Sequence, residues 1–160
     1  MTAKKHREPW KTKFEKTLLA VSFIGVLLSA YAITLHYSNS ESSICHIGPL
    51  FDCDKVNRSP WSELFGVPVA IFGLLAYLAV FYVVLFRHRI MRWTAFTHKD
   101  IALYLFIAAT GMLGFQAYLT LIEMFVIKSY CLVCVGSQIC TLLLGWFSWD
   151  EYSRAEDSYE

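Results

Sequence analysis

"CLVCVGSQICTLLLGWFSW", residues 131–149, places three cysteines in a stretch that is otherwise apolar enough to cross a membrane. A spanning helix needs about 20 predominantly apolar residues to cover roughly 30 Å of hydrocarbon. Cys131 and Cys134 stand at the start of this stretch with two residues between them, and Cys140 lies deeper. A pair of thiols is therefore predicted at the end of a membrane helix, where its chemistry depends on the side that it faces.

Three more apolar segments precede this stretch, at residues 17–37, 65–86 and 101–127. The 160-residue sequence is 56% hydrophobic and 17% charged, with a mean hydropathy of +0.45, which is more apolar surface than a soluble domain of this size can bury. Backbone groups in lipid must be hydrogen-bonded internally, and the alternation typical of β-barrel strands is absent. The predicted fold is all-α, a four-helix transmembrane bundle. Its predicted parts are a basic tail (1–16), a membrane domain (17–149) that includes a long loop (38–64), and an acidic tail (150–160).

Lysine and arginine are distributed unevenly between the predicted loops, and cytoplasmic loops normally carry the excess. They concentrate in the N-terminal tail and in the loop between the second and third segments, at Lys4, Lys5, Arg7, Lys11, Lys13, Lys16, Arg87, Arg89, Arg92 and Lys99. Both termini are therefore predicted to be cytoplasmic, and the 38–64 loop and the start of the fourth segment external. A cleaved signal peptide is an alternative for the first segment, but its apolar residues continue past the small residues at 30–32.

The Cys-x-x-Cys at Cys131 and Cys134 has the geometry for dithiol–disulfide exchange. A helix N-terminus stabilises a thiolate, which lowers the pKa of the leading cysteine. The second thiol lies one turn further on, about 4.5 Å along the helix axis, and can close a short disulfide with the first. The alternative is an inert or purely structural pair.

Cys45 and Cys53 form a second pair, with seven residues between them, in the long loop. On the oxidising side of a membrane, where disulfides persist, this pair is either a structural disulfide or a shuttle that carries electrons to Cys131 and Cys134. A zinc site made from the four thiolates is a further alternative, although the long spacing is unlike the short knuckles of such sites.

Polar residues follow Cys134 along one face of the same helix, at Ser137, Gln138 and Thr141. Such residues either hydrogen-bond to neighbouring helices or line a pocket for a lipophilic molecule with a polar head. A quinone fits physically, because it dissolves in the bilayer and accepts two electrons, and the chain has no haem, flavin or nucleotide motif. Cys140 points about 240° away from Cys134 around the helix and is predicted to be a packing residue.

Two smaller predictions concern the other spans. Glu123 lies near the outer end of the third segment, where an interfacial carboxylate is favoured over a proton relay. Four glycines are predicted to permit close helix approach, at Gly66, Gly73, Gly111 and Gly114.

Taken in order, these features resemble the vitamin K epoxide reductase family. Cys45 and Cys53 are followed by "DKVNRSPWSELFG", in which Ser59 comes six residues after Cys53, and the Cys-x-x-Cys begins the last span. The resemblance covers most of the chain. The stretch "FGVPVAIFGLLAYLAV", residues 65–80, looks more like the microbial members than the animal enzyme.

The resemblance implies roles for individual residues. Cys45 and Cys53 would be the shuttle cysteines, with Cys53 attacking Cys131, and Cys134 would lie nearest the quinone. Ser59 resembles a serine that hydrogen-bonds near the quinone, and it also suits the N-cap of a turn that begins with a proline. Gln138 stands where animal members carry a tyrosine, which puts vitamin K epoxide reduction in doubt.

The sequence thus predicts a membrane thiol oxidoreductase of the bacterial inner membrane, with its redox loop external. It would reoxidise a separate periplasmic thioredoxin-like (DsbA-like) protein and pass electrons to ubiquinone or menaquinone, with quinone contacts from Ser59, Ser137 and Gln138. No metal and no nucleic-acid partner are predicted. The alternatives are a vitamin K epoxide or quinone reductase proper, an enzyme resembling disulfide bond protein B, and a non-catalytic protein with two structural disulfides.

Overall fold

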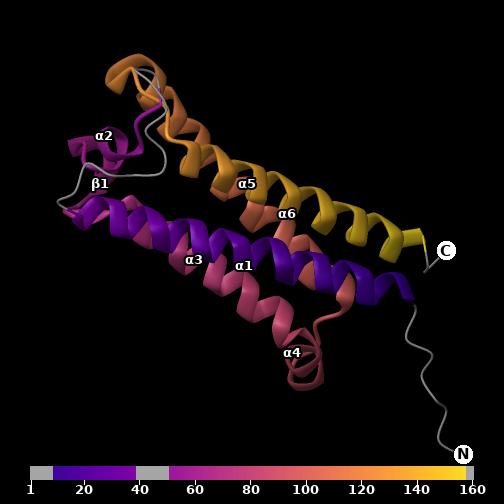
Figure 1. Ribbon diagram of the computed structural model, residues 1–160. Coiled ribbons are helices and arrows are strands. Elements are labelled where there is room, and N and C mark those ends of the chain that lie inside the picture. Colours follow the sequence, from indigo (N-terminus) through magenta and orange to yellow (C-terminus); the bar gives the residue numbers. More distant parts are fainter. Residues whose placement is uncertain (1–8, 39–50, 158–160) are drawn as a thin grey trace, which may run out of the picture.

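The computed structural model describes residues 9–38 and 51–157 and shows a bundle of long helices (Figure 1). Its main helices are α1 (Pro9–Tyr37), α3 (Val69–Leu85), α5 (His98–Ile122), which a π-helix, η2 (Glu123–Ile127), continues, and α6 (Leu132–Asp157). α1 packs against α3 and α6, and α5 packs against α6. The predicted helical bundle is confirmed.

The short elements gather at the two ends of the bundle (Figure 1). One end holds the start of α1, the end of α6 and the short α4 (Arg87–Trp93). The opposite end holds α2 (Cys53–Asn57), η1 (Pro60–Ser62) and a hairpin of β1 (Glu63–Leu64) and β2 (Val67–Pro68). The segment between η2 and α6 also lies at this second end, next to α2 (Figure 1), so the Cys131–Cys134 pair and the loop that contains Cys53 come together.

The helices have the length and surface of membrane spans. α1, α5 with η2, and α6 are each long and apolar enough to cross a membrane, and α3 with α4 forms a fourth candidate span that bends by 68°. Large apolar side chains cover the outside of the bundle, among them Phe23, Leu27, Ile107, Leu121 and Leu142, each about half exposed. A soluble protein rarely exposes so much apolar surface, and lipid is the solvent that accepts it. The chain is a multi-pass membrane protein.

The second span begins later than predicted, at Val69 rather than Phe65. Phe65 and Gly66 both have positive φ, 56° and 78°, and form the two-residue turn between β1 and β2. Turns of this kind match the twist of the flanking strands, which is why they close tight hairpins. Pro68 then ends the hairpin and stands immediately before the helix.

The other helix boundaries also differ from the apolar segments. α1 begins at Pro9 rather than residue 17, and α6 continues to Asp157 rather than ending at residue 149. α5 begins at His98 because Thr97 and Asp100 form a capping box, in which each side chain accepts the backbone N–H of the other. Hydropathy marks the lipid-facing part of a helix, whereas caps and exposed polar turns set where it ends.

Polar contacts tie the helices together where the hydrophobic effect does not drive association within lipid. Tyr77 of α3 is fully buried, and its hydroxyl contacts the Ser137 carbonyl at 2.7 Å, the Ser137 Oγ at 2.9 Å and the Thr141 Oγ1 at 2.7 Å. At the other end of the bundle, Arg87 and Glu151 form a buried ion pair. These contacts join α3 and the start of α4 to α6.

The predicted role of the glycines holds at one position of four. A Cβ on Gly73 would lie 3.3 Å from the Ser29 Oγ of α1, so this glycine permits a close approach. Gly111 and Gly114 have nothing within 4 Å, and Gly66 belongs to the hairpin turn, so the prediction is wrong for these three. The tightest site is Gly25, where a Cβ would lie 2.3 Å from the Tyr77 ring.

Candidate redox site

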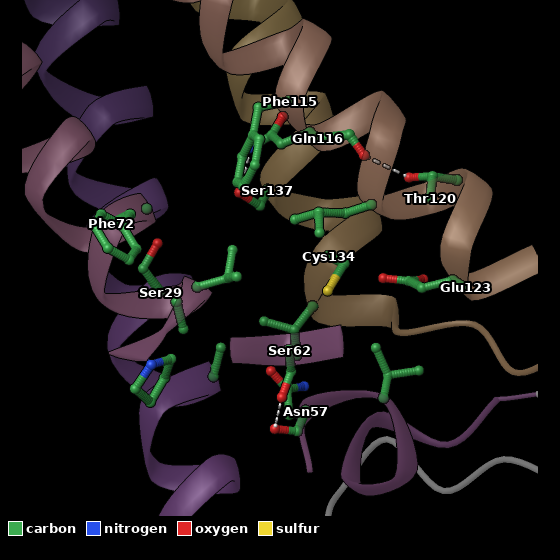
Figure 2. Close-up of a pocket in the computed structure, with 18 of the residues that line it drawn as sticks. Ser29, Asn57, Ser62, Phe72, Phe115, Gln116, Thr120, Glu123, Cys134 and Ser137 are labelled. Carbon is green, nitrogen blue, oxygen red and sulfur yellow. Dashed lines mark hydrogen bonds between the residues drawn. The ribbon is translucent and has the colours of Figure 1, made fainter. Parts of the chain in front are cut away.

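A cavity of about 320 Å³ lies between α1, α3, α5 and α6 at the end of the bundle that carries the hairpin. Its walls are mostly apolar, and its polar side chains include Gln116, Thr120 and Ser137 (Figure 2) as well as Gln138. Ligand pockets for small molecules have this size and this mixture of apolar walls with a few polar groups. The cavity suits a lipophilic molecule that carries hydrogen-bonding atoms.

Cys134 lines this cavity, and its sulfur points into it (Figure 2). Cys131 is fully buried behind it and packs in one apolar cluster with Cys53, which is also fully buried. Both Cys131 and Cys134 are free thiols, and Cys53 is disulfide-bonded. The structure therefore orders the sulfurs from Cys53 through Cys131 to Cys134 and the cavity. Cys45 lies outside the described residues.

The position of Cys131 follows from the local backbone. Lys128 has a left-handed φ of 55° and ends η2, and Cys131 immediately precedes α6 with its carbonyl accepting the Val135 N–H at 3.0 Å. Phe51 forms a bridge with Tyr130, and the Asp52 N–H donates to the Tyr130 carbonyl at 3.2 Å. These contacts hold the chain before Cys53 against the chain before Cys131.

Three hydrogen bonds converge on the Cys131 sulfur. The Cys134 thiol contributes one, the Cys134 N–H donates at 3.3 Å, and the Asn57 Nδ2 donates at 3.5 Å. Donors stabilise the thiolate, so they lower the pKa of Cys131 below its ordinary value, with the Cys134 thiol as the largest cause and burial opposing it. The pKa of Cys131 is thus lowered at the start of α6, the direction that the sequence predicted, and the role of its thiolate in disulfide exchange stays a prediction.

Asn57 links the two cysteine-bearing segments, a role that the sequence reasoning missed. Its Nδ2 donates to the Cys53 carbonyl at 2.9 Å as well as to Cys131. Its carbonyl contacts His36 Nδ1 at 2.5 Å and accepts from the Ser62 Oγ at 2.7 Å. α2 is therefore fixed to α1 and to the turn that follows it, and the sulfur of Cys131 receives a directed donor.

Ser137 and Gln138 both line the cavity, and both also bond to neighbouring helices. Gln116 Nε2 donates to the Ser137 Oγ at 3.0 Å, and Gln138 Nε2 donates to the Gln116 carbonyl at 3.2 Å and to the Thr120 Oγ1. The polar residues of this face thus both hydrogen-bond to a neighbouring helix and line the cavity. Gln116 and Thr120 were not predicted, although they and Glu123 stand at helical spacing, i, i+4 and i+7, along the third span.

Ser59 lines the cavity as well, but its hydroxyl donates to the Val56 carbonyl at 2.9 Å. It does occupy the N-cap position of η1 with Pro60 at the first helical position, yet its side chain makes no cap hydrogen bond. The predicted capping role is therefore wrong for the side chain and correct for the position.

The remaining predictions for this region concern Cys140 and zinc. Cys140 is buried in the central core with Leu18 and Leu144, so its prediction as a packing residue is confirmed. Cys53, being disulfide-bonded, offers no thiolate to a metal in this structure. Within residues 9–38 and 51–157, no group of three or more metal-binding side chains comes together.

Comparison with known families identifies the family of the chain. The sequence model of the Vitamin K epoxide reductase family matches residues 16–149, which include all the candidate spans in part or whole and all five cysteines. The chain therefore belongs to the vitamin K epoxide reductase family. Members of this family are quinone-dependent thiol–disulfide oxidoreductases of membranes.

Proposed function

We propose that this family member oxidises a thioredoxin-like protein on the external side of a bacterial inner membrane and delivers the electrons to ubiquinone or menaquinone. The observation that carries the proposal is the order of the sulfurs. Cys53 and Cys131 share one buried cluster, and Cys134, next to Cys131, opens on an apolar cavity. Electrons that pass along this order of sulfurs would reach a lipid-soluble acceptor only at Cys134.

In the proposed sequence of exchanges, a reduced donor protein first reduces the Cys45–Cys53 disulfide. The Cys53 thiolate then attacks the Cys131–Cys134 disulfide at Cys131, which forms a Cys53–Cys131 mixed disulfide and releases Cys134. Cys45 resolves this mixed disulfide, so the Cys131–Cys134 pair becomes reduced. Finally the pair closes its disulfide again, and two electrons and two protons convert the quinone to the hydroquinone.

The residues around the cavity support a quinone as the acceptor. The ring and tail of a quinone would meet apolar side chains such as Phe72 and Phe115, and its two oxygens would meet polar groups. Ser59, Ser137 and Gln138 are the proposed contacts for these oxygens, and Gln116 joins them because its Oε1 is buried without a partner. An acceptor without a donor suits the hydroxyl of the hydroquinone product.

The test is turnover in liposomes that contain a quinone, with a reduced thioredoxin-like protein outside and quinone absorbance as the readout. Cys134→Ala should abolish quinone reduction and accumulate the Cys53–Cys131 mixed disulfide. Cys140→Ala is the matched control, since that thiol packs in the core, and should retain turnover. A protein with two structural disulfides would show no quinone reduction in any variant, and normal turnover by Cys134→Ala would refute the mechanism.

A further inference from the structure

Glu123 is an acid that the protein buries at the cavity, near the end of the third span where the sequence predicted an interfacial carboxylate. It is 4% exposed and begins the π-helix η2. Among the described residues that line the cavity, it is the one acidic side chain. In Figure 2 its carboxyl group points toward the Cys134 sulfur.

The contacts of Glu123 place it beside both thiols. Its Oε2 accepts the Cys131 N–H at 3.2 Å, and the Cys134 sulfur faces its carboxyl group in the same cavity (Figure 2). Within residues 9–38 and 51–157, no lysine, arginine or histidine forms an ion pair with it. Burying a carboxylate without a cation costs free energy, so an acidic residue at such a position indicates a functional role.

We propose that Glu123 is the acid–base catalyst that moves protons from the thiols to the quinone. The proposal rests on the quinone reduction proposed above. Reduction of a quinone by a dithiol needs two protons as well as two electrons, and the walls of the cavity are mostly apolar and supply few groups that can carry a proton. A carboxylate next to the sulfur and on the wall of the cavity can carry these protons over a short distance.

The step balances as follows. The Glu123 carboxylate first accepts the proton that Cys131 loses as it ionises, and the resulting carboxylic acid gives this proton to one quinone oxygen. The carboxylate, ionised again, then accepts the proton of the Cys134 thiol as the Cys131 and Cys134 sulfurs form their bond and two electrons pass to the quinone. The carboxylic acid gives this second proton to the other quinone oxygen. Two thiols and one quinone thus become one disulfide and one hydroquinone.

A purely structural role is the competing explanation, because the carboxylate also accepts the N–H at the start of α6. Glu123→Gln separates the two roles. The amide oxygen still accepts the Cys131 N–H and keeps the shape of the side chain, but the amide cannot take up a proton. Asp150→Asn is the matched control, since Asp150 lies near the end of α6 at the opposite end of the bundle, pairs with Arg154 and does not line the cavity.

The experiment measures the rate of quinone reduction by the fully reduced protein, in single turnover, as a function of pH. The titratable groups on the elements around Glu123 include Lys128, Tyr130 and Cys131 before α6, Cys134 of α6, Asp54 and Lys55 of α2, and His36 of α1. The wild type should lose rate as the pH falls and Glu123 becomes protonated. Glu123→Gln should react about 10²-fold more slowly and lack this acid limb, whereas Asp150→Asn should match the wild type.

The outcomes distinguish the two proposals. If the wild type does not reduce a quinone, the proposed function fails. If the wild type is active and Glu123→Gln keeps its rate and its acid limb, the catalytic role of Glu123 is overturned and the residue only caps α6. Should Glu123→Gln not accumulate in the membrane, Glu123→Asp replaces it. A shifted acid limb in Glu123→Asp supports the proposal, and an unchanged one overturns it.

Discussion

Gly25 of α1 is predicted to be indispensable for the position of the Tyr77 ring, and Gly25→Ala tests this. A Cβ at this position would lie 2.3 Å from Cδ1, 2.4 Å from Cε1 and 2.7 Å from Cγ of Tyr77. Carbon atoms in contact normally stay about 3.5–4.0 Å apart. Because the contacts are with the inner half of the ring of a fully buried side chain, the ring must move or α1 must separate from α3.

The cost follows from two contributions. Overpacking a well-filled core costs about 1–3 kcal/mol. Displacing the ring also breaks the contacts of its hydroxyl with Ser137 and Thr141, which are worth about 0.5–1.5 kcal/mol each. Gly25→Ala is therefore expected to destabilise the protein by roughly 2–6 kcal/mol. Since Ser137 lines the cavity, quinone turnover should fall as well.

The assay is thermal unfolding of the purified protein in detergent, with Gly111→Ala as the matched control. A Cβ on Gly111 meets nothing within 4 Å, so alanine there adds helix propensity without a clash and should leave stability equal or higher. If Gly25→Ala unfolds at the wild-type temperature, the close approach of α1 to Tyr77 does not hold, and with it the account of how α3 is fixed to α6.

Two further predictions concern buried polar contacts. Asn57→Ala removes a donor to the Cys131 sulfur and should raise the pKa of that thiol, which ultraviolet titration of the thiolate in the wild type and the variant would measure. The pKa of Cys131 is lower in the folded protein than in the unfolded chain, so its thiolate stabilises the fold at high pH. This contribution is lost as the pH falls through the folded pKa, and Asn57→Ala should therefore also lower stability on the alkaline side. Identical thiolate titrations of the wild type and the variant would contradict this prediction. Arg87→Met leaves Glu151 buried without its cation and should lower the free energy of unfolding by about 3–5 kcal/mol, measured by thermal unfolding. Adding Glu151→Leu should recover most of that loss. A double variant that is no more stable than Arg87→Met alone would contradict this prediction.

The spans were predictable because hydropathy reports directly on lipid contact, and the four apolar segments each became a helix of the bundle. The helix boundaries were not predictable, since they depend on caps and turns of one or two residues, which a hydropathy average over a long window does not detect. Phe65 and Gly66 read as the start of a span, yet their left-handed backbone closes a hairpin. Such a turn is visible in sequence only as a glycine before Val67 and Pro68, and a phenylalanine in a left-handed conformation is too rare to expect.

The cysteines were easier to place than their surroundings for a related reason. Cys131 and Cys134 carry a spacing that is itself a chemical signal, whereas Asn57 becomes significant only when α2 folds back against α6. No spacing in the sequence links residues 57 and 131. Gln116, Thr120 and Glu123, by contrast, did carry a signal, because a polar row at helical spacing in an apolar span predicts a polar partner.

The two polar rows explain why the cavity is where it is. The row on α5 meets the row of Ser137 and Gln138 on α6, and the hydrogen bonds between them fix one wall. The other walls, from α1 and α3, contribute mostly apolar side chains. A molecule in this cavity would therefore orient its polar atoms toward α5 and α6. Glu123, in η2 directly after α5, and Cys134 of α6 line the same part of the cavity. Helix packing would thus put the Cys134 sulfur and the Glu123 carboxyl group on the same side of such a molecule, which is the arrangement that the proposed transfer of electrons and protons requires.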